Sequence, residues 1–268
     1  MVTTHVGLAA TASTTYSEPF NLARTLATVD KLSHGRAAWN IVTTFADGSV
    51  NFSRSRHPDH AERYAIAEEF VSVVKGLWRS WDPDPYVQNK ARGIYIDTGK
   101  MHALNHEGRH FSVAGPLNVT NSEQGQPVLI QAGSSGPGQA LAARHAEVVF
   151  TAQHDLDAAL AFATGLRRQV AEAGRDPRHC LIMPGLMPII GATEAEAHDK
   201  LAQLQSFTDQ SNALAILAEQ LAVDVSGFAL DEPLPTSPTD VVVHSRSALL
   251  IKLAQDGSSF EAWDASRA

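Results

Sequence analysis

The sequence contains a single cysteine, Cys180, among 268 residues. One thiol cannot form an internal disulfide, which excludes a disulfide-stapled secreted scaffold and favours a reducing compartment. No apolar run is long enough to cross a bilayer, and the first residues lack the basic start and apolar segment of a signal peptide. We therefore predict a cytoplasmic protein with no membrane partner.

Positive charge is also scarce. The 21 Lys and Arg residues against 29 Asp and Glu give a net charge of −8. A chain of that sign disfavours nucleic acid or an anionic membrane surface as its main partner. The composition, 44% hydrophobic and 19% charged, is that of an ordinary globular protein, and the length suits one large α/β domain or two small ones.

Short apolar runs alternate with helical patterns along most of the chain. Strands joined by helices imply parallel pairing, so the pattern predicts an α/β fold, either an open sheet or a barrel. The apolar runs predict strands at 6–10, 37–42, 128–132, 147–151 and 181–190. The helical patterns lie at 18–33, with Ser17 as its cap, and at 60–81, 139–144, 155–173, 193–222 and 245–256.

Two stretches interrupt this alternation. Residues 86–126 contain turn-forming Gly, Pro and Asn and predict an irregular excursion that carries a short hairpin. Residues 223–240 are rich in proline and predict a loop. We treat the whole range 1–268 as one domain with these two interruptions.

The segment from Pro127 to Ser135 carries the clearest chemical signal. A buried strand ends in Gly133, Ser134 and Ser135, and a helix follows. The first N–H groups of a helix lack internal partners and its dipole favours negative charge, so this pattern predicts a phosphate seat. The structural alternative is that Gly and Ser only form a turn.

Other polar side chains fall near the same edge of the predicted sheet. Thr11 lies just past the first strand, and Asn40 lies near the carboxyl end of the second. Ligands of parallel α/β folds bind at the carboxyl ends of strands. We therefore group Thr11 and Asn40 with Ser134 and Ser135, the alternative being that all of them cap helices and turns.

The start of the long helix adds two further candidates. His60 and Tyr64 are four residues apart and so share one face, where they could donate to a phosphate or stack on a planar ring. The alternative places His60 in solvent and packs Tyr64 locally.

The sequence gives weaker support to a metal site or to acid–base catalysis. His102, His106 and His110 recur every four residues, but their surroundings predict a loop and no other ligand completes a set, so we predict no metal. We interpret Glu68 and Glu69 as a solvated helix edge rather than a catalytic pair.

Several motifs in series resemble the bacterial-luciferase superfamily. Within it they resemble the branch of nitrilotriacetate and dibenzothiophene-sulfone monooxygenases, over almost the whole chain. The matching segments are Ala9–Arg24, His34–Thr43, His60–Tyr64, Ala67–Phe70, Gly115–Asn118, Gln131–Ser135 and Phe150–Ala152.

The resemblance implies a TIM (β/α)8-type barrel that uses reduced FMN, supplied by a separate flavin reductase, and O2 to oxygenate a small organic substrate. By motif, Thr11 and Asn40 would contact the flavin ring side. His60, Tyr64, Gly133, Ser134 and Ser135 would hold the phosphate end. The resemblance assigns no catalytic residue beyond this cofactor site and leaves the substrate open.

The chain departs from the family in length. We count five strands where a barrel has eight, with the first two and the last expected outside this sequence. Two open sheet edges predict marginal stability and self-association, hence a homo-oligomer. A non-catalytic remnant that keeps the flavin seat is therefore an alternative, and so is an unrelated phosphate-binding barrel such as an aldolase. The aldolase is disfavoured because no strand-end Lys stands near a matching acid.

Overall fold

A computed structural model of the chain describes residues 3–153, 156–207 and 209–221. The predicted loop at 223–240 and helix at 245–256 lie outside these residues. The chain divides into two compact units, 1–185 and 186–268, which we describe separately.

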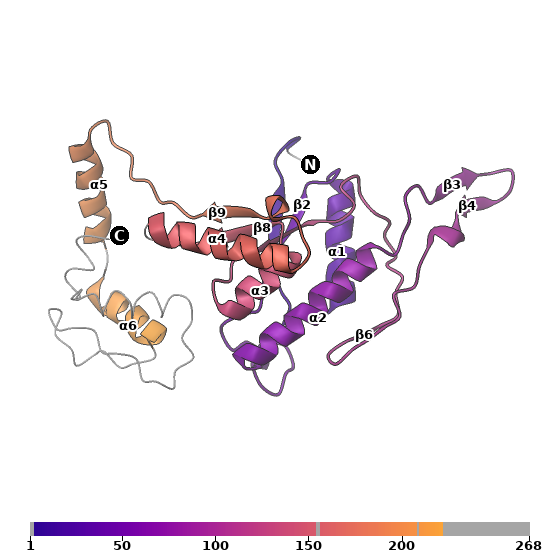
Figure 1. Cartoon of the computed structure of the whole chain (residues 1–268), viewed down its shortest axis with the longest axis horizontal. Helices are drawn as coiled ribbons and strands as arrows, with labels where there is room; N and C mark the ends of the chain where they lie inside the picture. The colour runs from indigo at the N-terminus through magenta and orange to yellow at the C-terminus, as the bar shows by residue number, and fades with distance from the viewer. Residues whose placement is uncertain (1–2, 154–155, 208, 222–268) are drawn as a thin grey trace. The chain divides into compact units, whose positions relative to one another are not determined.

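The first unit contains a five-stranded sheet in which all neighbouring strands run parallel (Figure 1). This confirms the predicted α/β class, and the five apolar runs supply the strands. Their order in the sheet is β1 (Leu8–Ser13), β2 (Ala37–Val42), β7 (Val128–Gln131), β8 (Val148–Thr151) and β9 (Leu181–Pro184).

Strand β1 begins and ends later than the sequence predicted. Its pairing with β2 continues from Leu8 opposite Ala37 to Ser13 opposite Val42. Thr11 therefore lies inside the strand, opposite Asn40, and the prediction that it follows the strand was wrong. The small residues at this end allow the ladder with β2 to extend further than the apolar run does.

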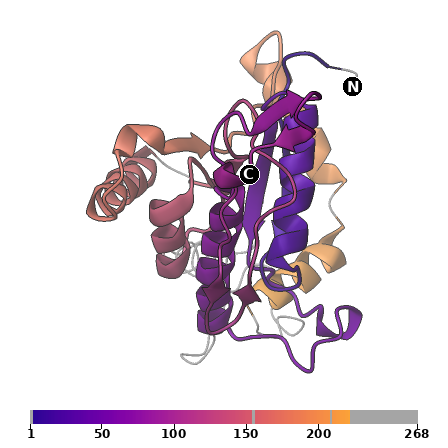
Figure 2. The same ribbon diagram turned by 90° about the vertical axis from the view of Figure 1, so that its right-hand side faces the viewer.

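Four helices of the first unit pack against one face of the sheet. Neighbouring helices lie side by side in chain order, α1 beside α2 and α3 beside α4 (Figures 1 and 2). Helix α1 starts at Pro19 after Glu18, which makes no side-chain cap, so the prediction of Ser17 as the cap was wrong. The bounds are α1 (Pro19–Leu32), α2 (His60–Trp78), α3 (Gly136–His145) and α4 (Leu156–Glu172).

The core lies between these helices and the sheet. Trp39 of β2 and Phe70 of α2 are fully buried with ring centroids 5.8 Å apart, and Leu129 of β7 joins the same cluster. Trp78 at the end of α2 donates its indole N–H to the carbonyl of Ala23 in α1 at 3.0 Å. Burial of each side chain of this size contributes about 1.5–3 kcal/mol, so this cluster holds α1 and α2 against β2 and β7.

The opposite face of the sheet has no helix packed on it among the described residues of this unit. Because side chains alternate along a strand, Asn40 points to this face while its neighbours Trp39 and Ile41 point to the core. Phe150 and Met183, paired across β8 and β9, are 46% and 56% exposed on the same face. This face therefore combines polar and apolar surface.

Residues 86–126, for which the sequence predicts an excursion with one short hairpin, contain two small hairpins (Figure 1). Strand β3 (Tyr86–Asn89) pairs with β4 (Ile94–Ile96), and β5 (His106–Glu107) pairs with β6 (Ser112–Val113). Short 3-10 helices lie at Ser49–Asn51, Thr98–Lys100 and Pro177–His179.

The second unit contains α5 (Glu194–Ser206) and α6 (Gln210–Leu221). Thr193 caps α5 by accepting from the Glu196 N–H at 3.2 Å, which confirms the predicted start. The single helix predicted over 193–222 was wrong, because Asp209 accepts from the Asn212 N–H at 2.9 Å and begins a new helix. The apolar periodicity of the sequence continues past Asp209, but in the structure the polar cap at Asp209 begins a new helix.

Candidate functional site

Thr11 and Asn40 meet on the face of the sheet that the helices leave open. The Asn40 amide Nδ2 donates to the Thr11 hydroxyl oxygen at 3.0 Å across β1 and β2. The amide oxygen of Asn40 is buried and has no hydrogen-bond partner among the described residues. A buried acceptor without a donor costs free energy, so this oxygen is suited to receive a donor from a ligand.

The turn after β7 has the form expected of an anion seat. Ser135 is the N-cap of α3, and its hydroxyl oxygen accepts from the Gly138 N–H at 3.3 Å. The carbonyl of Ser134 accepts from the Gln139 side chain at 2.8 Å. The Gly133 N–H donates to the Gln131 side-chain oxygen at 2.7 Å. Several groups of this turn are thus fixed in place before any ligand arrives.

Tyr64 of α2 lies directly against this turn. Its hydroxyl is 3.5 Å from the Ser135 hydroxyl, at the long limit of a hydrogen bond. A Cβ atom added to Gly133 or to Gly138 would lie 2.9 Å from the Tyr64 hydroxyl oxygen. Both positions therefore need glycine for the tyrosine to approach.

His60 lies one turn before Tyr64, with the two ring centroids 5.0 Å apart. The predicted shared face is therefore present. Burial, followed by the nearby charge of Arg63, lowers the pKa of His60. The structure thus brings His60, Tyr64, Gly133 and Ser135 to one place, and Thr11 and Asn40 to another.

A buried arginine beside this face was missed by sequence reasoning. Arg63 is 6% exposed, and its guanidinium donates to His57 Nε2 at 3.0 Å and to the Pro58 carbonyl at 2.9 Å. Because a guanidinium only donates, Nε2 accepts and the ring hydrogen of His57 lies on Nδ1. His57 Nδ1 therefore donates to the Tyr16 hydroxyl oxygen, and these two atoms are 2.6 Å apart. Loop residues carry no periodicity, so this network left no signal in the sequence.

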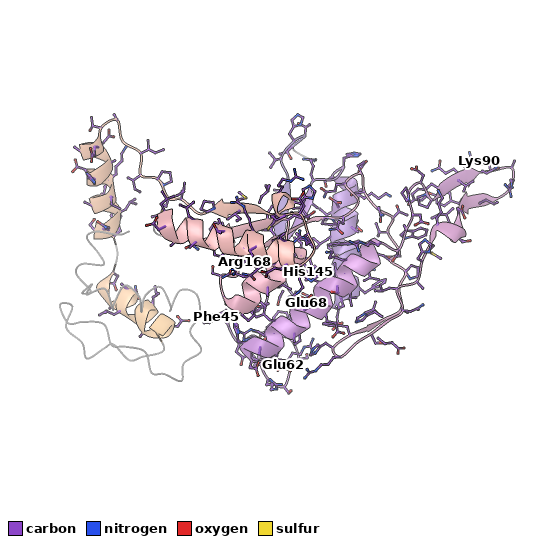
Figure 3. All side chains as sticks on the ribbon, viewed as in Figure 1. Phe45, Glu62, Glu68, Lys90, His145 and Arg168 are labelled. Carbon is purple, nitrogen blue, oxygen red and sulfur yellow. The ribbon has the colours of Figure 1, made fainter. Side chains whose placement is uncertain are left out.

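The interpretation of Glu68 and Glu69 as a solvated edge was wrong. Glu68 accepts from His145 Nε2 at 2.8 Å and from Arg144 at 2.9 Å, which ties α2 to the end of α3 (Figure 3). Burial by itself would raise the pKa of Glu68, but the hydrogen bonds and charges of His145 and Arg144 lower it to about 2. This carboxylate is therefore part of the frame that holds Tyr64 near Ser135.

The three spaced histidines do not assemble a metal site. His106 donates to Glu69 at 3.0 Å, and His102 pairs with Asp82 at 2.9 Å. No group of three metal-ligating side chains occurs within the described ranges. Cys180 is buried in the core between α3 and α4, and burial raises its pKa, as expected of an inert thiol.

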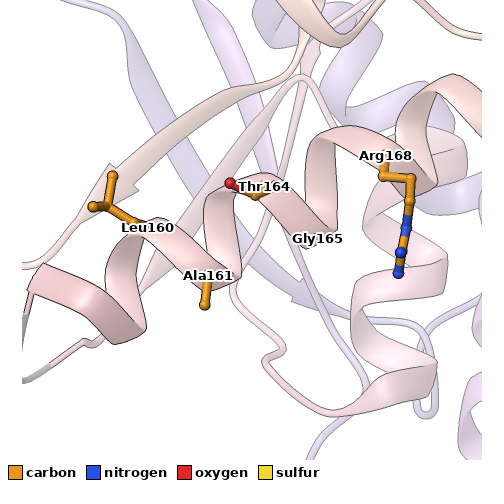
Figure 4. Close-up of a pocket in the computed structure, with 5 residues that line it drawn as sticks. All are labelled: Leu160, Ala161, Thr164, Gly165 and Arg168. Atoms are coloured by element: carbon orange, nitrogen blue, oxygen red, sulfur yellow. The ribbon is translucent and has the colours of Figure 1, made fainter.

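Two hollows are lined by residues other than the predicted cofactor-binding residues. One, of about 450 Å³, runs along a single exposed side of α4 and is lined by Leu160, Ala161, Thr164, Gly165 and Arg168 (Figure 4). A smaller one, of about 90 Å³, is lined by Thr15, Arg54, Pro58, Ile66, His110 and Phe111. None of the predicted site residues lines either hollow. Within the described ranges, no helix is long and apolar enough to cross a membrane.

Comparison with known proteins identifies the family. The profile described as luciferase-like monooxygenase matches residues 1–233. The chain belongs to the luciferase-like monooxygenase family. This confirms the resemblance, and the five-stranded parallel sheet matches part of the TIM barrel of the family.

Two curated relatives are similar over 258 residues, or 95% of this chain. One is the N-acetyl-S-(2-succino)cysteine monooxygenase of Bacillus subtilis (strain 168), 51% identical, and the other is nitrilotriacetate monooxygenase component A of Aminobacter aminovorans, 42% identical. The chain covers 58% and 57% of their respective lengths, so it spans little more than half of each relative.

A solved structure of riboflavin lyase, with modified FMN and riboflavin, is also similar. It matches with a TM-score of 0.83 and 30% identity, over 98% of this chain and 58% of that one. In its described residues the chain thus has the fold of part of that structure.

Proposed function

We propose that this chain forms the FMN phosphate seat and part of the flavin pocket of a monooxygenase. In this proposal the enzyme uses reduced FMN and O2 to oxygenate a small organic substrate. The observation that carries it is the turn at Gly133–Ser135, which opens α3 and packs against Tyr64.

The turn supports phosphate binding on physical grounds. The N-terminus of α3 carries partial positive charge, although Pro137 has no N–H and the Gly138 N–H already donates to Ser135, and hydroxyl groups stand beside it at Ser135 and Tyr64. A phosphate group carries up to two negative charges and binds such charge-assisted donors strongly. His60, at the start of α2, adds an imidazole on the same side.

The residues near the sheet also fit a flavin. The unpartnered amide oxygen of Asn40 suits one of the N–H groups of the flavin ring. Thr11 accepts from Asn40 at 3.0 Å, which leaves its own hydroxyl hydrogen for a ligand acceptor. We therefore assign Thr11 and Asn40 to the ring end of the cofactor and His60, Tyr64, Gly133, Ser134 and Ser135 to its phosphate end.

Bound reduced FMN would supply the electrons that activate O2, while the protein orients the cofactor and excludes water. The relatives named above support this reaction class, because both are named monooxygenases, and one is named as a component. We propose a separate flavin reductase as the transient partner, a homo-oligomer as the assembly and the cytoplasm as the location.

The proposal is tested by titrating the purified chain with FMN and with riboflavin, which lacks the phosphate. Loss of one or two charge-assisted hydrogen bonds costs about 1.5–3 kcal/mol each, so riboflavin should bind at least about ten-fold more weakly. Fluorescence quenching of each flavin measures both affinities. Equal affinities would remove phosphate recognition from this site.

The alternative is a chain that binds flavin without oxygenating a substrate. It is favoured by the exposed apolar side chains Phe150, Leu181 and Met183 on the open face of the sheet. The two functions separate when a flavin reductase, NADH and a candidate substrate are added. Oxygenated product supports the monooxygenase, whereas flavin binding without product supports the alternative.

A further inference from the structure

Gln131 is a polar residue that is buried at the end of a strand. It is the last residue of β7 and only 4% exposed, between the sheet and the helices. Its side-chain oxygen accepts from the Gly133 N–H at 2.7 Å. A backbone N–H can only donate, so this bond fixes which end of the amide is oxygen and which is the NH2 group.

The NH2 group of Gln131 is consequently directed at the turn. A Cβ atom added to Gly133 would lie 2.4 Å from Gln131 Nε2 and 2.9 Å from the Tyr64 hydroxyl oxygen. The two donors thus converge on the same side of Gly133. The structure gives Gln131 Nε2 no hydrogen bond to another described residue, whereas the oxygen of the same amide is bonded to Gly133.

We propose that Gln131 is a further binding residue of this seat, whose NH2 group donates to a phosphate oxygen alongside Tyr64. This inference rests on the proposed function and adds to it a donor from the strand rather than from the helix. The Gly133 N–H orients the donor in advance, so little side-chain entropy is lost on binding.

Gln139, eight residues later in the chain, has a side-chain amide that is hydrogen-bonded at both ends. Its Nε2 donates to the Ser134 carbonyl at 2.8 Å, and its oxygen accepts from Gln169 at 3.2 Å. Both ends of this amide have partners inside the protein. Gln139 therefore serves as the matched control for Gln131.

The experiment compares Gln131→Glu with Gln139→Glu in FMN and riboflavin titrations. Glutamate at 131 keeps an oxygen for the Gly133 N–H but replaces the donor with a negative charge. We expect the FMN dissociation constant to rise at least ten-fold while that of riboflavin changes less than two-fold. Gln139→Glu puts the same charge in the first turn of α3, and its effect on FMN should be at least five-fold smaller.

Equal effects of the two substitutions on FMN, or an equal loss of FMN and riboflavin in Gln131→Glu, would overturn the assignment. If the wild-type chain itself binds both flavins equally, the proposed phosphate seat fails instead. If a variant does not fold, a measurement on the wild-type chain tests the assignment instead. The side-chain NH2 resonances of Gln131 should shift when FMN is added and stay in place with riboflavin. Identical responses to the two flavins would also overturn the assignment.

Discussion

Helix α2 is held on two sides by adjacent glutamates, and the two sides differ in what they hold. On one side Glu68 binds the side chains of Arg144 and His145 at the end of α3. On the other side Glu69 binds the β5–β6 hairpin, mainly through the backbone N–H groups of His110 and Phe111. Neighbouring residues on a helix point about 100° apart, so two like charges serve two different partners.

The two sides also differ in consequence. Tyr64 lies one turn before Glu68 on the α3 side, so the ion pairs of Glu68 stand behind the proposed phosphate seat. His145 keeps only 10% of its side chain exposed in this contact. Glu69 instead fixes a hairpin within the excursion at 86–126. We expect damage on the α3 side to be global and damage on the hairpin side to be local.

Among the changes that compare the two sides of α2, replacement of Glu68 with Ala should cause the largest loss of stability. It leaves Arg144 and the nearly buried His145 without their carboxylate, at a cost of about 2–3 kcal/mol in the free energy of unfolding. Thermal melts should show a fall in Tm of about 4–10 °C. Glu172→Ala removes an exposed pair with Arg168 at 3.6 Å and should change Tm by less than about 2 °C. If both variants melt alike, the α3 side does not carry the stability assigned to it.

Sequence reasoning predicted the strands and the helices that contact the core. Apolar runs and helical periodicity suffice there, because burial against the sheet imposes both patterns. The same reasoning predicted that His60 and Tyr64 share one face of α2, because their spacing follows from the helix itself. It also found the turn at Gly133–Ser135, because glycine and a capping serine leave a local signal.

The partners of Glu68 and Glu69 could not be predicted in this way. Glu68 pairs with residues 76 and 77 positions later, and the periodicity of α2 carries no information on what faces it across the interface. Arg63 carries no signal of its own in the sequence, whereas the fold buries it against His57 and Pro58. Gln131 belongs to one of the segments that resemble the family. The signal that would have identified it is a polar residue at the end of a buried strand.

Acid should weaken the α3 side through Glu68. The pKa of this carboxyl is lowered from 4.5 to about 2 in the folded chain, so its stabilisation is complete above pH 4.5 and is lost as pH falls toward 2. Because a third of the Glu68 side chain is exposed, its ionisation contributes only about 1–2 kcal/mol to the free energy of unfolding. Urea unfolding of wild type and Glu68→Gln across pH 2–6 isolates this contribution. Their difference should shrink steadily below pH 4.5, and a constant difference would show that Glu68 is not ionised in its ion pairs.

The smallest effect is expected from Glu69→Gln on the hairpin side. The amide oxygen of glutamine can still accept from the N–H groups of His110 and Phe111, but without the negative charge these bonds lose about 1 kcal/mol. Hydrogen exchange at those two amides should become about five-fold faster, while Tm shifts by less than about 3 °C. Glu68→Gln is the matched control, and it should leave the exchange of both amides by local opening of the hairpin unchanged. Exchange that speeds up equally in both variants would mean that α2 and its two partners open as a single unit, and the distinction between its two sides would be lost.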